Sequence, residues 1–210
     1  MMGPEEFAGL ADVSRETLEK FQIYLELLKK WRSSHNLVGV STLADPWRRH
    51  FLDSAQVLMR WREEGPARAA QSWLDLGSGA GFPGLVLAIM GAGEVHLVES
   101  NGKKCAFLRQ VIRSTGAKAR VHQGRIGDID LLPVDVITSR ALASISRILT
   151  LGEKFCGSDT EYWLLKGAAA QRELTEARKY WKVDWRFFQS VTDDFGAVLR
   201  LRECKRVDQA

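Results

Sequence analysis

The glycine-rich segment Trp73–Gly84, WLDLGSGAGFPG, is the strongest indication of chemistry in the chain. A hydrophobic strand is expected to end at Asp75 and Leu76, and the glycines that follow then form a turn that opens a helix. Glycine suits this turn because the backbone bends sharply and must approach a ligand without an intervening Cβ atom. The residues expected to contact a cofactor here are Asp75, Gly77, Ser78, Gly79, Gly81 and Phe82.

Glu99 ends the next expected strand, 22 residues after Gly77. A carboxylate at that place can accept hydrogen bonds from both hydroxyls of a ribose. Either S-adenosylmethionine or a dinucleotide would satisfy this arrangement, and Gly79, Gly81 and Gly84 do spell the dinucleotide pattern GxGxxG. That pattern begins two residues after Gly77, however, and the acidic strand end suits a sulfonium and an α-amino group. S-adenosylmethionine is therefore favoured over a dinucleotide and over a turn without a ligand.

Alternating strands and helices are expected to position these residues from residue 72 onward. Such alternation predicts βαβ units and a mostly parallel sheet, with the ligand site beyond the carboxyl ends of the strands. The expected strands are Ser72–Leu76, Glu94–Glu99, Lys118–His122, Val134–Thr138 and Glu161–Lys166. The expected helices between them are Leu85–Met90, Lys103–Ser114, Ala143–Leu149 and Ala168–Tyr180. Two final strands, Trp185–Ser190 and Ala197–Cys204, are expected to form an antiparallel hairpin.

Two helices are expected before the first strand. Ser14–Trp31 has apolar residues at three- and four-residue steps, and Pro46–Trp61 begins with a proline at the first helical position. The sequence therefore predicts two parts, an N-terminal helical subdomain over residues 1–70 and a cofactor-binding α/β domain over residues 71–210.

Composition limits the class of protein. The 210 residues include three cysteines without a CxxC pair, which excludes a disulfide scaffold and disfavours a structural zinc site. No His, Asp or Glu cluster has metal-ligand spacing, so no metal is expected. The N-terminus does not resemble a signal peptide, and the longest apolar run, Leu85–Met90, is too short to span a bilayer. A soluble, cytoplasmic protein without membrane contact is expected.

Basic residues are concentrated in one part of the chain. The segment Ser100–Gly127 contains seven Lys or Arg residues and no Asp or Glu, whereas the whole chain has a net charge of only +4. A concentrated positive face indicates a polyanion partner such as nucleic acid. The simpler alternative is a solvated helix face. Arg109 and Arg113 lie four residues apart, opposite the apolar side of an expected helix, and are assigned to solvent.

Beyond these patterns, the chain resembles the RsmG (GidB, glucose-inhibited division protein B) family of 16S rRNA guanine-N7 methyltransferases. The matching blocks run from about Asn36 to Gly167, and the RHFLDS and TSRA blocks make the resemblance specific. In order they are NLVGV, RRHFLDS, LDLGSGAGFPG, LVESNGKKCAFLRQV, HQGRI, DVITSRALAS and WLLKG. The resemblance implies a Rossmann-like class I methyltransferase sheet of seven strands, preceded by helices.

The resemblance also implies a reaction. S-adenosylmethionine would be the cofactor, S-adenosylhomocysteine its product, and guanine N7 in the 530 loop of 16S rRNA the target. The substrate would be rRNA in a small ribosomal subunit or its precursor, and the enzyme is expected to be a monomer. Two alternatives from other classes stay open, namely an NAD-dependent oxidoreductase and a non-catalytic RNA-binding module.

Several residue roles follow from the resemblance. Gly77 and Phe82 would line the methionine and ribose, Glu99 would bind the ribose, and Asn36 would lie over the pocket. Arg140 is the catalytic candidate, which would either orient guanine O6 or contact the cofactor. Further cofactor contacts are expected from Arg125, Ile126 and Gly127.

The chain departs from the family pattern at two positions. Gly127 stands where a glutamate is usual, so Asp128 is a possible replacement. Ala197 stands near a usual arginine, so Arg200 or Arg202 could substitute. Contacts with rRNA are expected from Lys103, Lys104, Arg125, Lys166, Arg200 and Arg202. His50 is interpreted as a structural residue rather than a catalyst.

Overall fold

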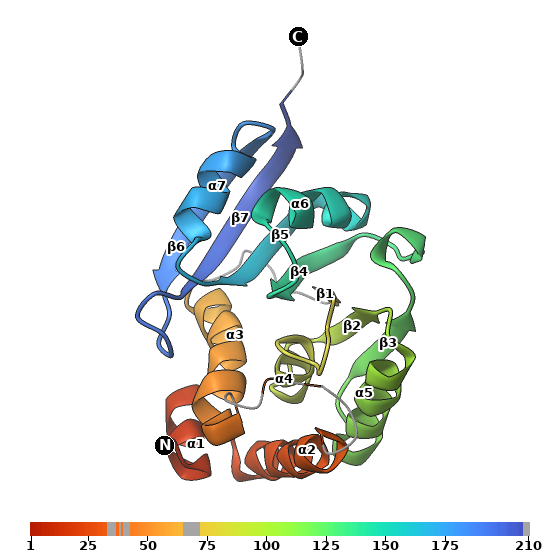
Figure 1. Cartoon of the computed structure of the whole chain (residues 1–210), viewed down its shortest axis with the longest axis vertical. Helices are drawn as coiled ribbons and strands as arrows, with labels where there is room; N and C mark the ends of the chain where they lie inside the picture. The colour runs from red at the N-terminus through yellow and green to blue at the C-terminus, as the bar shows by residue number, and fades with distance from the viewer. Residues whose placement is uncertain (33–36, 38, 40–42, 65–71, 208–210) are drawn as a thin grey trace.

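A computed structural model describes residues 1–32, 37, 39, 43–64 and 72–207 of the chain. Its centre is one seven-stranded sheet with the strand order β3-β2-β1-β4-β5-β7-β6 (Figure 1). The strands are β1 (Ser72–Leu76), β2 (Glu94–Glu99), β3 (Ala119–Gln123), β4 (Val134–Arg140), β5 (Cys156–Lys166), β6 (Trp181–Gln189) and β7 (Ala197–Arg206). The first five pair in parallel, while β7 pairs antiparallel with both β5 and β6. The predicted parallel sheet and C-terminal hairpin are confirmed.

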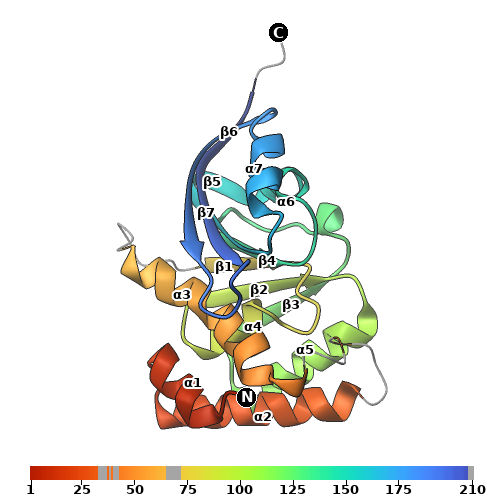
Figure 2. The ribbon, with the colours of Figure 1, turned by 60° about the vertical axis from the view of Figure 1, so that its left-hand side comes forward.

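Helices cover both faces of the sheet, with α6 and α7 on one face and α3 on the other (Figure 2). The helices are α1 (Pro4–Ala11), α2 (Arg15–Arg32), α3 (Asp53–Glu63), α4 (Gly84–Ile89), α5 (Gly102–Thr115), α6 (Ile145–Gly152) and α7 (Ala170–Ala177). A π-helical turn, η2 (Trp47–Leu52), precedes α3, and the 3₁₀ turns η3 (Ile126–Asp128) and η4 (Glu153–Phe155) precede β4 and β5. None of the helices in the described part of the chain is both long and apolar enough to cross a bilayer.

The N-terminal helices share one hydrophobic cluster with the sheet and its covering helices. Phe7, Phe21 and Phe51 are fully buried, and the Phe51 ring lies 5.7 Å from that of Phe82 in the glycine-rich turn. Aromatic rings of this size provide much of the apolar area that a small core buries. The predicted boundary between residues 70 and 71 falls beside a segment outside the described residues and stays a prediction.

Several element bounds differ from the sequence-based expectation. The helix expected at Pro46–Trp61 is split into the π-helical turn η2 and α3, and α1 was not predicted. Strand β5 begins at Cys156 rather than Glu161. The sequence did not predict this earlier start because the first residues of the strand are mostly polar and exposed and show no apolar alternation. Strand β6 begins at Trp181, which pairs with Arg206 at the far end of β7. These strands are longer than predicted because their ends pair with neighbouring strands, which the local pattern of apolar residues does not indicate.

The strand order creates a crevice at one edge of the sheet. The chain runs from β1 through β2 to β3 on one side and then crosses back to β4 on the other side of β1, so the strand order reverses at β1. In open α/β sheets, ligands bind beyond the carboxyl ends of the strands at this reversal. Leu76, Glu99 and Arg140 end β1, β2 and β4, which brings the glycine-rich turn and both functional candidates to the same edge.

Candidate cofactor and substrate site

The turn after β1 is held by hydrogen bonds within its own backbone and to β2. Ser78 N donates to Val98 O at 3.0 Å, and Gly81 N donates to Ser78 O at 2.7 Å. Gly81 has a φ of +94°, and a Cβ atom there would lie 2.6 Å from Leu85 Cδ1 and 2.7 Å from Tyr24 Oη. The positive φ and the close approach together require glycine.

Asp75 lies beneath this turn and is only 1% exposed. Its Oδ2 accepts a hydrogen bond from Gly84 N at 3.2 Å, and its Oδ1 accepts one from Thr138 Oγ1, also at 3.2 Å. Burial raises the pKa of this carboxyl to about 6. The Ser78 hydroxyl is also turned inward, donating to Asp75 O at 3.0 Å. Both side chains are thus engaged within the protein and hold the glycine-rich turn in place. The predicted cofactor contacts of Asp75 and Ser78 stay predictions.

Glu99 lies beside the turn at the end of β2. Its Oε2 accepts from Gly79 N at 2.9 Å, and its Oε1 accepts from Asn101 N at 2.8 Å. A carboxylate offers about four lone-pair directions, so each oxygen can accept a further hydrogen bond. A carboxylate beside a glycine-rich turn fits a nucleoside cofactor.

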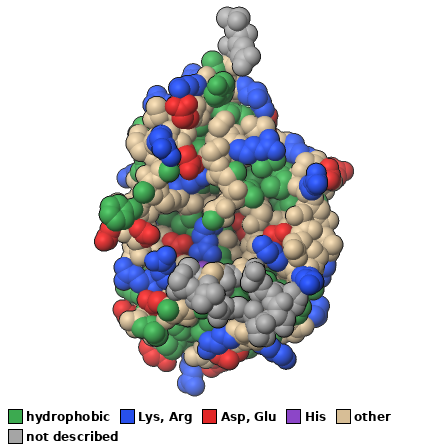
Figure 3. Space-filling view, in the orientation of Figure 1, with side chains coloured by type: hydrophobic (Ala, Val, Ile, Leu, Met, Phe, Trp, Pro, Cys, Tyr) green, Lys and Arg blue, Asp and Glu red, His purple; other side chains and the backbone are tan. Residues whose placement is uncertain are grey.

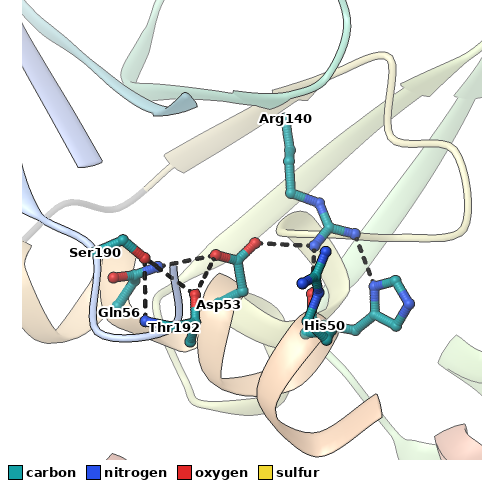
Figure 4. Close-up of polar contacts among 7 residues, drawn as sticks. His50, Asp53, Gln56, Arg140, Ser190 and Thr192 are labelled. Atoms are coloured by element: carbon teal, nitrogen blue, oxygen red, sulfur yellow. Dashed lines mark hydrogen bonds and ion pairs between the residues drawn. The ribbon is translucent and has the colours of Figure 1, made fainter. Parts of the chain in front are cut away.

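Arg140 is held at the end of β4 by three acceptors. Its Nη1 donates to Arg49 O at 3.2 Å and to Asp53 Oδ2 at 3.0 Å, and its Nη2 pairs with His50 Nδ1 at 3.2 Å (Figure 4). The guanidinium also lies 5.0 Å from the centre of the Phe82 ring. An arginine side chain has five N–H donors, so donors beyond these three contacts are available to a ligand oxygen.

His50 is buried and stacks on Phe82 with ring centres 4.8 Å apart. Burial, together with the positive charges of Arg140 and Arg49, lowers the pKa of His50 to about 3. Because arginine can only donate, His50 Nδ1 must be the acceptor in their contact. A neutral imidazole that uses Nδ1 in this way supports the interpretation of His50 as a structural residue.

A pocket of about 710 Å³ adjoins Arg140. The face shown in Figure 3 is hollowed near its centre, with Lys and Arg side chains in and around the hollow. Three segments form the walls of the pocket: η2 with the start of α3, the ends of β4 and β5, and the loop between β6 and β7. Polar residues on these walls include Arg49, His50, Asp53, Arg140, Lys166 and Thr192. Its size and mixed lining suit a small ligand or a single nucleotide base.

Three basic residues predicted to contact rRNA are paired within the chain. Lys166 Nζ donates to Ala143 O at 2.6 Å and forms an ion pair with Glu173 at 2.8 Å. Arg200 is buried against Glu64, and Arg202 pairs with Glu161. A carboxylate therefore already neutralises each charge, and a phosphate contact by any of these residues would have to compete with its ion pair. The predicted phosphate contacts of Lys166, Arg200 and Arg202 stay predictions. Arg200 and Arg202 are not among the residues that line the 710 Å³ pocket, and their predicted substitution for an arginine near Ala197 stays a prediction.

The other basic candidates lie at the surface. Lys103 and Arg125 are exposed and Lys104 is half-buried, and η3 places Ile126 half-buried beside the exposed Gly127. Asp128, the possible replacement for a glutamate at Gly127, is exposed on the same turn. Arg109 and Arg113 are exposed, as expected. Asn36 lies outside the described residues. Within the described part of the chain, no group of three His, Cys, Asp or Glu side chains could hold a metal ion.

Sequence reasoning missed the roles of Tyr24, Asp53 and Thr192. Tyr24 Oη donates to Ala80 O in the glycine-rich turn, and its ring stacks on Phe82 at 5.3 Å. The spacing of His50 and Asp53 in RRHFLDS, three residues apart, would have placed both on one helix face. No local pattern indicates the partners of Tyr24 or Thr192.

Comparisons with known proteins agree with this geometry. A family model described as rRNA small subunit methyltransferase G matches residues 17–196. Ribosomal RNA small subunit methyltransferase G of Rhodospirillum rubrum is 48% identical over 98% of this chain and 100% of its own length. The Paramagnetospirillum magneticum protein of the same name is 47% identical over 98% of both chains.

Solved structures with low sequence identity share the fold. A single-residue mutant of MtNAS in complex with S-adenosylmethionine aligns with a TM-score of 0.60 at 16% identity, over 96% of this chain and 84% of its own. A TehB-like S-adenosylmethionine-dependent methyltransferase from Corynebacterium glutamicum aligns with a TM-score of 0.54, also at 16% identity, over 86% of this chain and 96% of its own.

Proposed function

Because the chain belongs to the rRNA small subunit methyltransferase G family, we propose that it methylates guanine N7 in the 530 loop of 16S rRNA, with S-adenosylmethionine as methyl donor. The observation that supports this most directly is the position of Arg140. Its guanidinium lines the 710 Å³ pocket and lies against Phe82 of the glycine-rich turn. A base in that pocket would therefore lie beside a cofactor bound at the turn.

The residues that would hold the cofactor are those at the carboxyl ends of β1 and β2. Glu99 would accept hydrogen bonds from the ribose hydroxyls, and the glycine-rich turn would contact the cofactor through the backbone of Gly77 and Gly79. Ile126 and Gly127 would flank the adenine. When bound, S-adenosylmethionine supplies an electrophilic methyl group on a sulfonium.

The chain's own contribution to the reaction is positioning. Guanine N7 carries a lone pair in the neutral base, so no residue has to remove a proton from it. Placing N7 in line with the methyl group can lower the activation free energy of methyl transfer by roughly several kcal/mol. Arg140 would donate to guanine O6 or anchor the cofactor. The neutral His50, with Nδ1 used by Arg140, is consistent with a mechanism without a general base.

Lys103, Lys104 and Arg125 would contact rRNA phosphates. Such contacts position a nucleic acid without reading its sequence. The proposed substrate is rRNA within a small ribosomal subunit or its precursor, and the proposed active form is a cytoplasmic monomer.

The test is transfer of a labelled methyl group from S-adenosylmethionine to 16S rRNA in ribosomal particles that lack this modification. The product is then mapped by strand cleavage at N7-methylguanine. A single hit in the 530 loop is expected. Cofactor binding without transfer would move the substrate to another RNA, and absence of cofactor binding would contradict the roles of Gly77 and Glu99. Full turnover by Arg140→Ala would contradict the role of Arg140.

A further inference from the structure

Asp53 lies between Arg140 and the loop that joins β6 and β7, and it forms hydrogen bonds with both. Its Oδ2 accepts the 3.0 Å hydrogen bond from Arg140. Its Oδ1 accepts from Thr192 Oγ1 at 2.8 Å and from Gln56 Nε2 at 3.0 Å (Figure 4). Arg140 ends β4, whereas Thr192 belongs to the loop between β6 and β7. One carboxylate therefore joins the proposed catalytic side chain to the opposite wall of the pocket.

The contact with the loop is reinforced around Thr192. Gln56 Oε1 accepts from Val191 N at 3.1 Å, and Gln56 Nε2 donates to Ser190 Oγ at 3.2 Å. Arg48 Nε donates to Thr192 O at 3.3 Å. The start of α3 and the preceding turn thus hold both the backbone and the side chains of this loop segment. Thr192 is itself buried, so its bond to Asp53 is shielded from solvent.

The π-helical turn η2 explains how one short segment can supply so many contacts. Arg49 O, His50 Nδ1 and Asp53 Oδ2 all face the same guanidinium, although α-helical geometry alone would direct a backbone carbonyl along the helix axis. A π turn contains an extra residue and often occurs at functional sites. Of these acceptors, Asp53 also accepts a hydrogen bond from the β6–β7 loop.

We propose that Asp53 is a positioning residue that sets the geometry of Arg140 and of the loop segment 190–196 together. The inference rests on the proposed role of Arg140 in methyl transfer. In this arrangement, the charge of Asp53 fixes the direction of the guanidinium, and its second oxygen holds the loop that forms another wall of the pocket. A change on the loop side is thereby transmitted to Arg140 through one carboxylate.

The first test uses Asp53→Asn, Thr192→Val and the control Asp184→Asn. Asp184 is an aspartate on β6 that also pairs with an arginine, at 3.5 Å, but it does not line the pocket. Circular dichroism and Tm establish that each variant is folded. We expect Asp53→Asn to lower kcat by at least about ten-fold, which corresponds to about 1.4 kcal/mol in the barrier. Thr192→Val should raise KM for the ribosomal particle about five-fold without changing the Kd of S-adenosylmethionine.

A double-mutant cycle separates positioning from a general structural effect. If Asp53 affects kcat through Arg140, then the kcat of Asp53→Asn combined with Arg140→Lys should be no lower than that of Arg140→Lys alone. Losses of activity that multiply in the double variant would overturn the proposal. Equal kcat values for Asp53→Asn and Asp184→Asn would also overturn the proposal, provided that the wild-type enzyme methylates the particle.

A readout without catalysis keeps this inference separate from the proposed function. Amide hydrogen exchange of residues 190–196 should be faster in Asp53→Asn and Thr192→Val than in Asp184→Asn. If the unmodified protein does not methylate rRNA yet the exchange changes as expected, the proposed reaction fails while the coupling stands. Unchanged exchange in both variants would overturn the coupling itself.

Discussion

At the scale of single side chains, Phe82 contacts three other residues of the site. Its ring stacks on Tyr24 at 5.3 Å and on His50 at 4.8 Å, and it lies 5.0 Å from the Arg140 guanidinium. Phe82 is 4% exposed, so most of its ring faces protein rather than a ligand. The guanidinium and the imidazole therefore both pack against the Phe82 ring, and a movement of the glycine-rich turn would change the position of Arg140.

Asp75 should make stability depend on pH. Burial raises its folded-state pKa from 3.8 to about 6, so between these values the folded protein binds more protons than the unfolded chain. The free energy of unfolding should consequently fall by about 2 kcal/mol as the pH rises from 4 to 6, and by about 3 kcal/mol over the full titration from well below pH 4 to well above pH 6. Asp75→Asn should remove this component, which urea unfolding of both proteins at several pH values would measure. Parallel pH profiles would contradict the expectation.

Tyr24→Phe should weaken the glycine-rich turn. The change keeps the stacked ring but leaves Ala80 O without its hydroxyl donor, and a buried unsatisfied group costs about 1–3 kcal/mol. We expect a lower Tm and weaker S-adenosylmethionine binding by calorimetry. Tyr180→Phe is the matched control because Tyr180 is 54% exposed. Equal cofactor Kd values for the two variants would show that Tyr24 does not support the turn.

At the scale of elements, α5 joins the cofactor side to the basic surface. Asn101 caps the helix, its Oδ1 accepting from Lys103 N at 2.9 Å and from Lys104 N at 3.2 Å. Phe107, Leu108 and Val111 are fully buried against the sheet, as their spacing predicts. The helix begins at Gly102, three residues after Glu99 ends β2. Lys103 and Lys104 are in this way fixed near the proposed ribose site.

Replacing Lys103 and Lys104 by alanine should weaken rRNA binding without affecting the cofactor. Each lost phosphate contact should reduce the slope of log K against log salt by about one. Filter binding of a 530-loop fragment across salt concentrations measures this slope. Arg113→Ala serves as control because it removes a positive charge from the exposed distal end of the same helix. A slope equal to that of the control would exclude these lysines from the interface.

At the scale of the whole molecule, α3 connects the N-terminal helices to the C-terminal hairpin. Its first residue, Asp53, bonds to the β6–β7 loop, and Glu64, just beyond its end, pairs with both Arg186 of β6 and Arg200 of β7. The side chains of Glu64 and Arg200 are 13% and 11% exposed, so this pair is largely removed from water. Contacts at both ends of α3 thus hold this helix against the C-terminal hairpin and its loop.

Glu64→Gln should destabilise the protein without abolishing cofactor binding. It leaves the buried Arg200 charge without its main partner, at a cost of about 3 kcal/mol. For a chain of this size, that corresponds to a fall in Tm of roughly 6–12 °C. Scanning calorimetry would measure the change. Glu153→Gln, which removes the partner of Arg206 at the surface, should shift Tm much less. Equal shifts would contradict the importance of burial.

The sequence by itself determined the features that lie in contiguous residues. The glycine run, the carboxylate of Glu99 and the alternation of strands with helices predicted the sheet, the turn and the cofactor class. The family resemblance supplied the reaction and drew attention to Arg140. Each of these depends on local spacing, because backbone periodicity and turn chemistry are set over a few residues.

Only the tertiary structure decided which charges are available and which are paired. Asp53 bonds to Arg140 and Thr192 across 87 and 139 residues of sequence, and Arg200 bonds to Glu64 across 136. Such pairings depend on how distant elements pack, so an arginine that pairs in the interior looks the same in the sequence as one that binds RNA. For this reason the sequence could not show that Arg200 is buried against Glu64. For the same reason Asp53, at the centre of the site, was overlooked.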